Sequence, residues 1–147
     1  AGAAGSTLKE IEQILTESTL NKLSPEGREL ATKEALAILN DISGVAAVVI
    51  ATVDGFDVAS EVRNGLDPAR IAALASSIAA IGEVVATEAR LGRNKSVTID
   101  TEAGFAVIYS VHRRDIGLVI NVIATSEALI GQVNYRTAAA ARALVTT

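Results

Sequence analysis

One stretch of the chain, residues 68–91, has apolar or small residues on every side of a helical wheel. Between Ile71 and Gly82 it contains no charged residue. Asp67 and Pro68 supply an N-cap and a first helical residue, and the glycine after residue 91 can end the helix. A helix without a polar face is buried on two sides, so one side is expected to pack on a sheet and the other on a second helix. The side predicted to face the sheet carries Ile71, Leu74, Ala75, Ile78, Gly82, Val85 and Ala89.

The other side of this helix consists of small and β-branched residues, which let two helix backbones approach closely. We therefore expect it to pack against the same helix of a second copy. The strand that follows is an unprotected edge rich in Thr and Val, where two copies can pair strand to strand. The predicted dimer interface consists of Ala73, Ser77, Ala80, Val84, Thr87, Val97 and Ile99.

Five other segments have the hydrophobicity pattern of β-strands. Residues 45–53 and 116–124 are almost continuous apolar runs, which predict central strands that are covered on both faces. Residues 56–62 and 95–101 alternate apolar and polar side chains, as edge strands do. Residues 104–112 are intermediate and form a further strand.

Short turns join consecutive strands, so these strands should pair in antiparallel fashion. Asp54-Gly55 is a strong signal for a two-residue hairpin turn. With the two most apolar strands in the middle, we expect the sheet order 2-1-5-4-3. The predicted fold class is α+β: an α/β sandwich with a five-stranded antiparallel sheet, the long helix on one face and two helices on the other. Those two helices are expected to begin at Ser24-Pro25 and at Ser126.

The amino-terminal part of the chain divides into two pieces in front of the domain at 24–147. Residues 1–6 (AGAAGS) resemble a remnant of an expression tag and are left out of the fold. Residues 7–23 contain a short amphipathic helix, which is marginal in isolation and must dock on something. Two interpretations remain open: the helix covers its own domain, or it is an arm for partner binding or self-assembly.

Composition narrows the function classes. A net charge of −4 over 147 residues argues against a general nucleic-acid binder, which needs a basic surface. The absence of cysteine excludes a disulfide framework and thiolate chemistry, and it fits a reducing cytoplasm, where we expect the protein to lie. No uninterrupted apolar run reaches the roughly 18 residues of a membrane span, so we expect no membrane span.

Few residues are candidates for chemistry. The single histidine, His112, has no partners at metal-ligand or catalytic spacing, and Asp54 and Asp57 are explained by the turn that they flank. Asn121 interrupts a central strand, where its amide should bond neighbouring backbone or help fix the strand register. We therefore predict no catalytic residue, no metal site and no cofactor, and a protein that is not an enzyme.

Four segments together resemble a known family: GVAAVVIATVDGFDVAS, IAALASSIAAIGEVVA, KSVTIDTEAGFAVIYSV and IGLVINVIA. In element order, turn chemistry and central helix the chain resembles the roadblock/LC7 domain family, and in particular its bacterial, MglB-like members. The resemblance covers about residues 24–144. It implies a homodimer with a ten-stranded sheet, acting as a scaffold or regulator of a small Ras-like GTPase in the cytoplasm.

The resemblance also implies a surface that faces the GTPase, for which the candidates are Ile81, Glu88, Arg90 and Arg93. The arginines have two interpretations: an arginine finger for the GTPase, or cations that complement the end of a helix. The predicted function is a GAP-like or localisation cofactor of a small GTPase, with a second copy and the GTPase as partners. Two alternatives are a ligand-sensing domain of the profilin or PAS type, and a self-assembling structural module.

Overall fold

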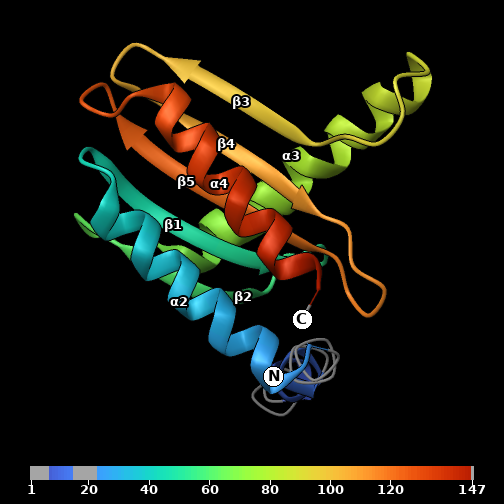
Figure 1. The fold of residues 1–147 in the computed structure, drawn as a ribbon. Helices are drawn as coiled ribbons and strands as arrows, with labels where there is room; N and C mark the ends of the chain where they lie inside the picture. The colour runs from blue at the N-terminus through green and yellow to red at the C-terminus, as the bar shows by residue number, and fades with distance from the viewer. Residues whose placement is uncertain (1–6, 15–22, 147) are drawn as a thin grey trace.

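The structure, a computed structural model, describes residues 7–14 and 23–146. Residues 7–14 are helical, and the predictions made for 1–6 and 15–22 lie outside the described residues. The other elements are α2 (Pro25–Asp41), β1 (Val45–Thr52), β2 (Asp57–Val62), α3 (Pro68–Glu88), β3 (Ser96–Thr101), β4 (Gly104–Val111), β5 (Leu118–Thr125) and α4 (Ile130–Val145) (Figure 1).

The five strands form one antiparallel sheet in the order β2-β1-β5-β4-β3. The predicted order and fold class are confirmed. β1 and β5 are buried along almost their whole length, whereas β2 and β3 form the two edges. The continuous apolar runs thus occupy the positions where a strand has neighbours on every side.

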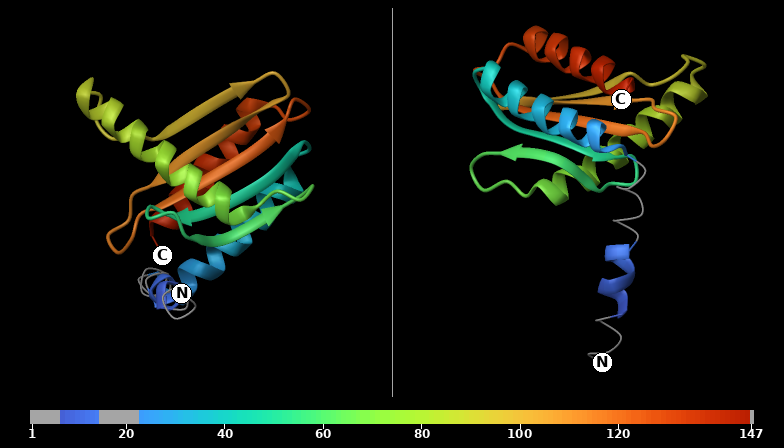
Figure 2. Two further views of the ribbon diagram at one scale, coloured as in Figure 1. Left: turned by 180° about the vertical axis from the view of Figure 1, so that it is seen from behind. Right: turned by 60° about the horizontal axis from the view of Figure 1, so that its bottom comes forward.

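Helices cover the two faces of the sheet unequally. α2 and α4 pack side by side on one face, and α3 crosses the other face diagonally and contacts all five strands (Figures 1 and 2). The α2–α4 side holds the larger hydrophobic core, with Ile38, Ile50 and Ile120 among its fully buried members. The α3 side is thin and rich in alanine, and this difference decides which surfaces of α3 remain open.

The predicted sheet-facing side of α3 is wrong in part. Ala72, Ala75, Ser76, Ala79 and Ala86 are the buried residues of the helix. Leu74 and Val85, which were expected to face the sheet, are instead exposed. The small side chains allow the helix to lie close to the sheet, and this close approach turns the large side chains outward.

Two local boundaries also differ from the predictions. Asp54-Gly55 is not a two-residue hairpin turn: Val53 and Asp54 form the turn, and Gly55 follows with φ +93°, its N–H donating to Thr52 O at 2.9 Å. A glycine after a two-residue turn accommodates the positive φ that closes a three-residue hairpin loop.

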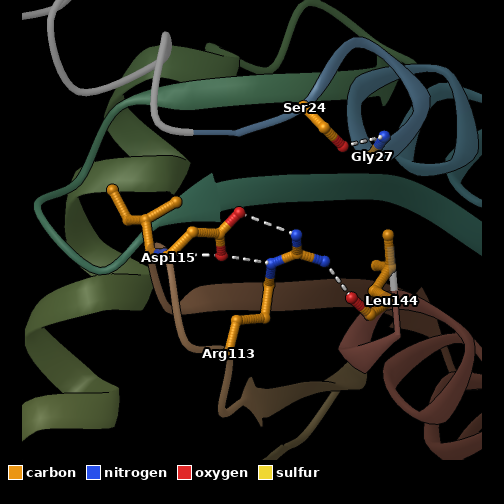
Figure 3. Close-up of polar contacts among 6 residues, drawn as sticks. Ser24, Gly27, Arg113, Asp115 and Leu144 are labelled. Atoms are coloured by element: carbon orange, nitrogen blue, oxygen red, sulfur yellow. Dashed lines mark hydrogen bonds and ion pairs between the residues drawn. The ribbon is translucent and has the colours of Figure 1, made fainter.

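The start of α4 is also later than predicted. Ser126 does not cap the helix, because α4 begins only at Ile130. The N–H of Ser126 instead donates to Ala103 O at 3.0 Å. Leu129 stands at the N-cap position and makes no side-chain capping bond. At the start of α2 the predicted Ser24 cap is confirmed, since its Oγ accepts the N–H of Gly27 at 3.0 Å (Figure 3).

Candidate functional site

The outer side of α3 carries a row of exposed large apolar side chains. The exposed fractions are 54% for Leu74, 64% for Ile81, 62% for Val84 and 58% for Val85. No element that the structure describes covers this side of the helix (Figure 2). We call these four residues the α3 ridge. Contiguous exposed apolar surface of this kind marks an interaction site.

α3 is long and mostly apolar. By length and composition it is the one described helix that could cross a membrane, although only 22% of its most apolar window is buried. Its alanine side lies against the sheet, so the helix is part of the sandwich. The four ridge residues are among its most hydropathic side chains, and their exposure reinforces the need for something to cover that side.

The open edge of the sheet adjoins the ridge. β3 pairs with β4 alone, which leaves its other edge free of strand partners among the described residues. At Gly82 an added Cβ would lie 2.9 Å from Val97 Cγ2, so the glycine brings α3 against the start of β3. Ile99, farther along the strand on the same face, is 39% exposed. Helix ridge and strand edge therefore form one continuous surface.

The residues predicted for the dimer interface lie on this side of the molecule. Those on α3 are all exposed. On β3, Val97 is half-buried and Ile99 is exposed. The set consists of Ala73, Ser77, Ala80, Val84 and Thr87 on α3, with Val97 and Ile99 on β3. The prediction omitted Leu74 and Val85, because it placed them against the sheet, and assigned Ile81 to another surface.

A cavity of about 1030 Å³ lies on the other flank of α3, between this helix and the β4–β5 loop. Its walls include Ala79, Ala80 and Glu83 of α3 and the strand residues Val111 and Val119. The end of α4 closes one side of the cavity. Elements that are distant in the sequence thus form a single concave site.

The β4–β5 loop is held by Arg113, whose side chain is almost fully buried. Its Nε and Nη2 donate to the two carboxylate oxygens of Asp115, both at 2.9 Å, and its Nη1 donates to Leu144 O at the end of α4 (Figure 3). The hydrogen bonds from Arg113 lower the pKa of Asp115 from 3.8 to about 2. The loop is therefore tied to α4 by a bidentate ion pair and a backbone contact.

Polar groups also gather at the cavity around His112. Its Nε2 lies 3.2 Å from Asn94 O and 3.8 Å from Glu83 Oε1, and Glu83 Oε1 accepts the N–H of Asn94 at 3.1 Å. His112 is exposed just past the end of β4 and has an acidic neighbour in Glu83. Within 7–14 and 23–146, no group of three His, Cys, Asp or Glu residues could hold a metal ion.

Solved structures with the same architecture are known. A roadblock/LC7 domain from Streptomyces avermitilis matches with a TM-score of 0.69 and 15% identity over 77% of this chain and 92% of that one. The gliding protein MglB from Thermus thermophilus matches with a TM-score of 0.71 and 16% identity over 84% and 91%. The chain has the roadblock/LC7 fold. Myxococcus xanthus MglB is similar too, with a TM-score of 0.69 and 14% identity over 84% and 96%.

Comparison by sequence finds less than comparison by structure. No protein-family profile matches the chain, and no curated protein matches it. At these identities the likeness concerns the roadblock/LC7 fold: a five-stranded sheet with one long helix across one face and two helices on the other. The α3 ridge and the cavity are features of this chain's own residues.

The four candidates for the GTPase-facing surface all lie on the α3 side of the roadblock/LC7 fold. Ile81 belongs to the ridge, and Glu88 is exposed at the last turn of α3. Arg90 follows the helix with φ +57°, and Arg93 lines the cavity. Both arginines are exposed. Their position past the helix end agrees with either interpretation, an arginine finger or cations at a helix carboxyl end.

The two remaining polar candidates have clear positions. Asn121 is only 5% exposed and lies between Val49 and Ile108 on the α3 side of the sheet, yet its Oδ1 has no hydrogen-bond partner among the described residues. The expected backbone bond to this oxygen is therefore not made. Asp57 accepts a hydrogen bond from Ser60 Oγ at 2.8 Å, which is a local structural contact.

Proposed function

We propose that the protein is a homodimeric scaffold or regulator of a small Ras-like GTPase. The single observation that carries the proposal is the α3 ridge beside the open β3 edge. A second copy related by a two-fold axis covers both features at once, because an isologous interface brings the same patch of each protomer together. The resemblance to roadblock/LC7 domains supports the same arrangement.

In this dimer the two β3 edges pair and the sheet continues across the axis. The two α3 helices then lie next to each other on one face of the combined sheet. Burying a large aliphatic side chain contributes about 1.5–3 kcal/mol, and the ridge supplies four such side chains from each protomer. A strand ladder and this apolar area together form an interface of the kind that holds a stable homodimer.

The paired α3 helices form the docking surface for the GTPase. Glu88, Arg90 and Arg93 border this surface with charged groups that are exposed. The chain acts by holding or repositioning the switch loops of the GTPase, or by localising it, and phosphoryl transfer remains the chemistry of the GTPase itself. If Arg90 or Arg93 reaches the bound nucleotide, the role is GAP-like, since an arginine finger stabilises transition-state charge.

Binding and hydrolysis measurements test this proposal. The partner is the small GTPase encoded nearest to this chain in its genome, loaded with GDP or with a non-hydrolysable GTP analogue. We expect saturable binding that prefers one nucleotide state. Arg90→Ala and Arg93→Ala should reduce single-turnover hydrolysis if an arginine finger acts, while the matched control Arg70→Ala, at the other end of α3, should leave it unchanged. No binding in either nucleotide state contradicts the proposal.

A second candidate function is self-assembly beyond the dimer, which residues 7–14 favour. Leu8, Ile11 and Ile14 of this helix are 62%, 47% and 63% exposed, so its apolar stripe is open. Among similar structures, one is described as MglB with tetrameric arrangement. Deleting residues 1–22, which spares the buried Leu23, should lower the mass measured by light scattering to that of the dimer. An unchanged mass argues against this candidate.

A further inference from the structure

The cavity between α3 and the β4–β5 loop has the chemistry of a ligand site. We propose that it binds a small anionic amphiphile, meaning a molecule with a carboxylate or phosphate head and an apolar body. This inference does not require the proposed function, although the two share Arg93; Arg114 belongs to the cavity alone. It rests on the volume of the cavity, its apolar floor, its unpaired cations and its place on α3.

The volume of the cavity and its apolar floor can accommodate the apolar part of such a ligand. Small-molecule pockets usually measure about 300–1,000 Å³, and this cavity, of about 1030 Å³, is slightly larger. Its accessible apolar floor is formed by Val53, Ala80 and Val145, of which Val53 and Val145 are 51% and 47% exposed. Covering such a floor with a hydrocarbon chain removes apolar surface of both partners from water, which is favourable.

Two cationic side chains of the cavity have no acidic partner among the described residues. Arg113 and Asp115 neutralise each other in a bidentate pair. Glu83 accepts a backbone N–H and lies beside His112. Arg93 and Arg114 also line the cavity, and neither makes a hydrogen bond or ion pair with any residue in the described part of the chain. Two guanidinium groups with free donors match a carboxylate or phosphate, which they bind in bidentate geometry.

The site is held in shape before a ligand arrives. The ion pair of Arg113 and Asp115 fixes the loop that forms one wall, and the bond to Leu144 O fixes that loop to α4 (Figure 3). A ligand therefore does not have to order this wall when it binds, and preorganisation of this kind increases affinity.

Most of the cavity lies on a different flank of α3 from the ridge. Glu83 lines the cavity and Val85 belongs to the ridge, and two residues along an α-helix are separated by about 200° around its axis. The same relation holds between Ser76 on the cavity side and Leu74 on the ridge. The two surfaces meet at Ala80, which lines the cavity and belongs to the predicted dimer interface. A second copy on the ridge therefore borders the cavity at Ala80 and leaves the flank at Ser76 and Glu83 accessible.

Titration of the full chain with matched probes tests the site. Octanoate and octyl phosphate carry the two head groups on the same tail, inorganic phosphate lacks the tail, and octanol lacks the charge. Below the micelle threshold, we expect at least one amphiphile to bind saturably and to raise the melting temperature. Phosphate alone and octanol should bind at least tenfold more weakly. The comparison of the two amphiphiles identifies the head group.

Two variants and a control complete the experiment. Arg93→Gln and Arg114→Gln should each weaken binding of the amphiphile about tenfold, since each removes a charged hydrogen bond worth about 1.5 kcal/mol or more. Arg70→Gln, an exposed position on α3 outside the cavity, should not. All three arginines are exposed and make no hydrogen bond or ion pair with the described residues, so the variants should fold. The site is refuted if neither amphiphile binds, if octanol binds equally well, or if all three variants bind alike.

Discussion

Val85→Glu tests whether the α3 ridge is buried between two copies of the chain. Val85 is 58% exposed in the protomer, so the substitution should leave the folded protomer intact, and Glu is compatible with a helix interior. Fully burying a valine side chain contributes about 1.5–3 kcal/mol, so covering the exposed part of Val85 contributes about 1 kcal/mol in each protomer. The two-fold axis doubles this, and desolvating two carboxylates adds at least about 1 kcal/mol.

The expected weakening is therefore about 3 kcal/mol, which raises the dimer dissociation constant by about 100-fold. Sedimentation equilibrium over a concentration series measures this constant. Leu36→Glu is the matched control, because Leu36 is 45% exposed and lies inside α2 on the opposite layer. Circular dichroism should show equal helix content in both variants. If Val85→Glu and Leu36→Glu have the same dissociation constant as the unmodified chain, the assignment of the ridge as an interface is refuted.

Three further predictions concern the stability of the protomer, each checked by urea unfolding. Asp115→Asn removes the ion pair to Arg113: because that pair lowers the pKa of the carboxyl from 3.8 to about 2, its stabilisation is present above pH 4 and lost as pH falls toward 2. With the side chain 34% exposed, the loss at pH 7 should be about 1 kcal/mol and should vanish near pH 2. Ser24→Ala removes the capping bond to Gly27 N and should cost about 1 kcal/mol with an unchanged m-value. Gly104→Ala would drive a Cβ into the carbonyl oxygen of Ala124 on β5 and should cost at least about 2 kcal/mol, so full stability in this variant would contradict the close approach of the two strands.

The sheet could be predicted because its signals are strong and local. Residues 45–53 and 116–124 are so apolar that only central positions can bury them, and this alone decides the order once the short turns are known. The start of α2 was equally clear, since Ser24-Pro25 combine a capping side chain with a fixed φ.

The orientation of α3 could not be obtained in the same way. Its wheel is apolar all round, so hydrophobicity does not distinguish the side facing the sheet from the outer side. The choice depends on side-chain size: the alanines fit the narrow space above the sheet, and Leu74 and Val85 do not. Only the three-dimensional distance between helix and sheet reveals this preference.

The cavity was also invisible in the sequence. Its walls come from α3, the β4–β5 loop and the end of α4, and its loop is held by a contact between Arg113 and Leu144 O, 31 residues apart. No spacing rule connects such residues. An aromatic content of 3% does not prevent a pocket lined by alanine, valine and leucine.

The most direct test of the account is the distance between protomers at the two edges of the sheet. The chain contains no cysteine, so Thr98→Cys on β3 or Glu61→Cys on β2 places one spin label on each protomer. If the sheet continues through β3, labels at residue 98 should lie within about 25 Å of each other. Labels at residue 61 should be nine strand spacings apart, about 40 Å. A shorter distance at residue 61 than at residue 98, or no coupling at either position, would contradict a dimer built through β3.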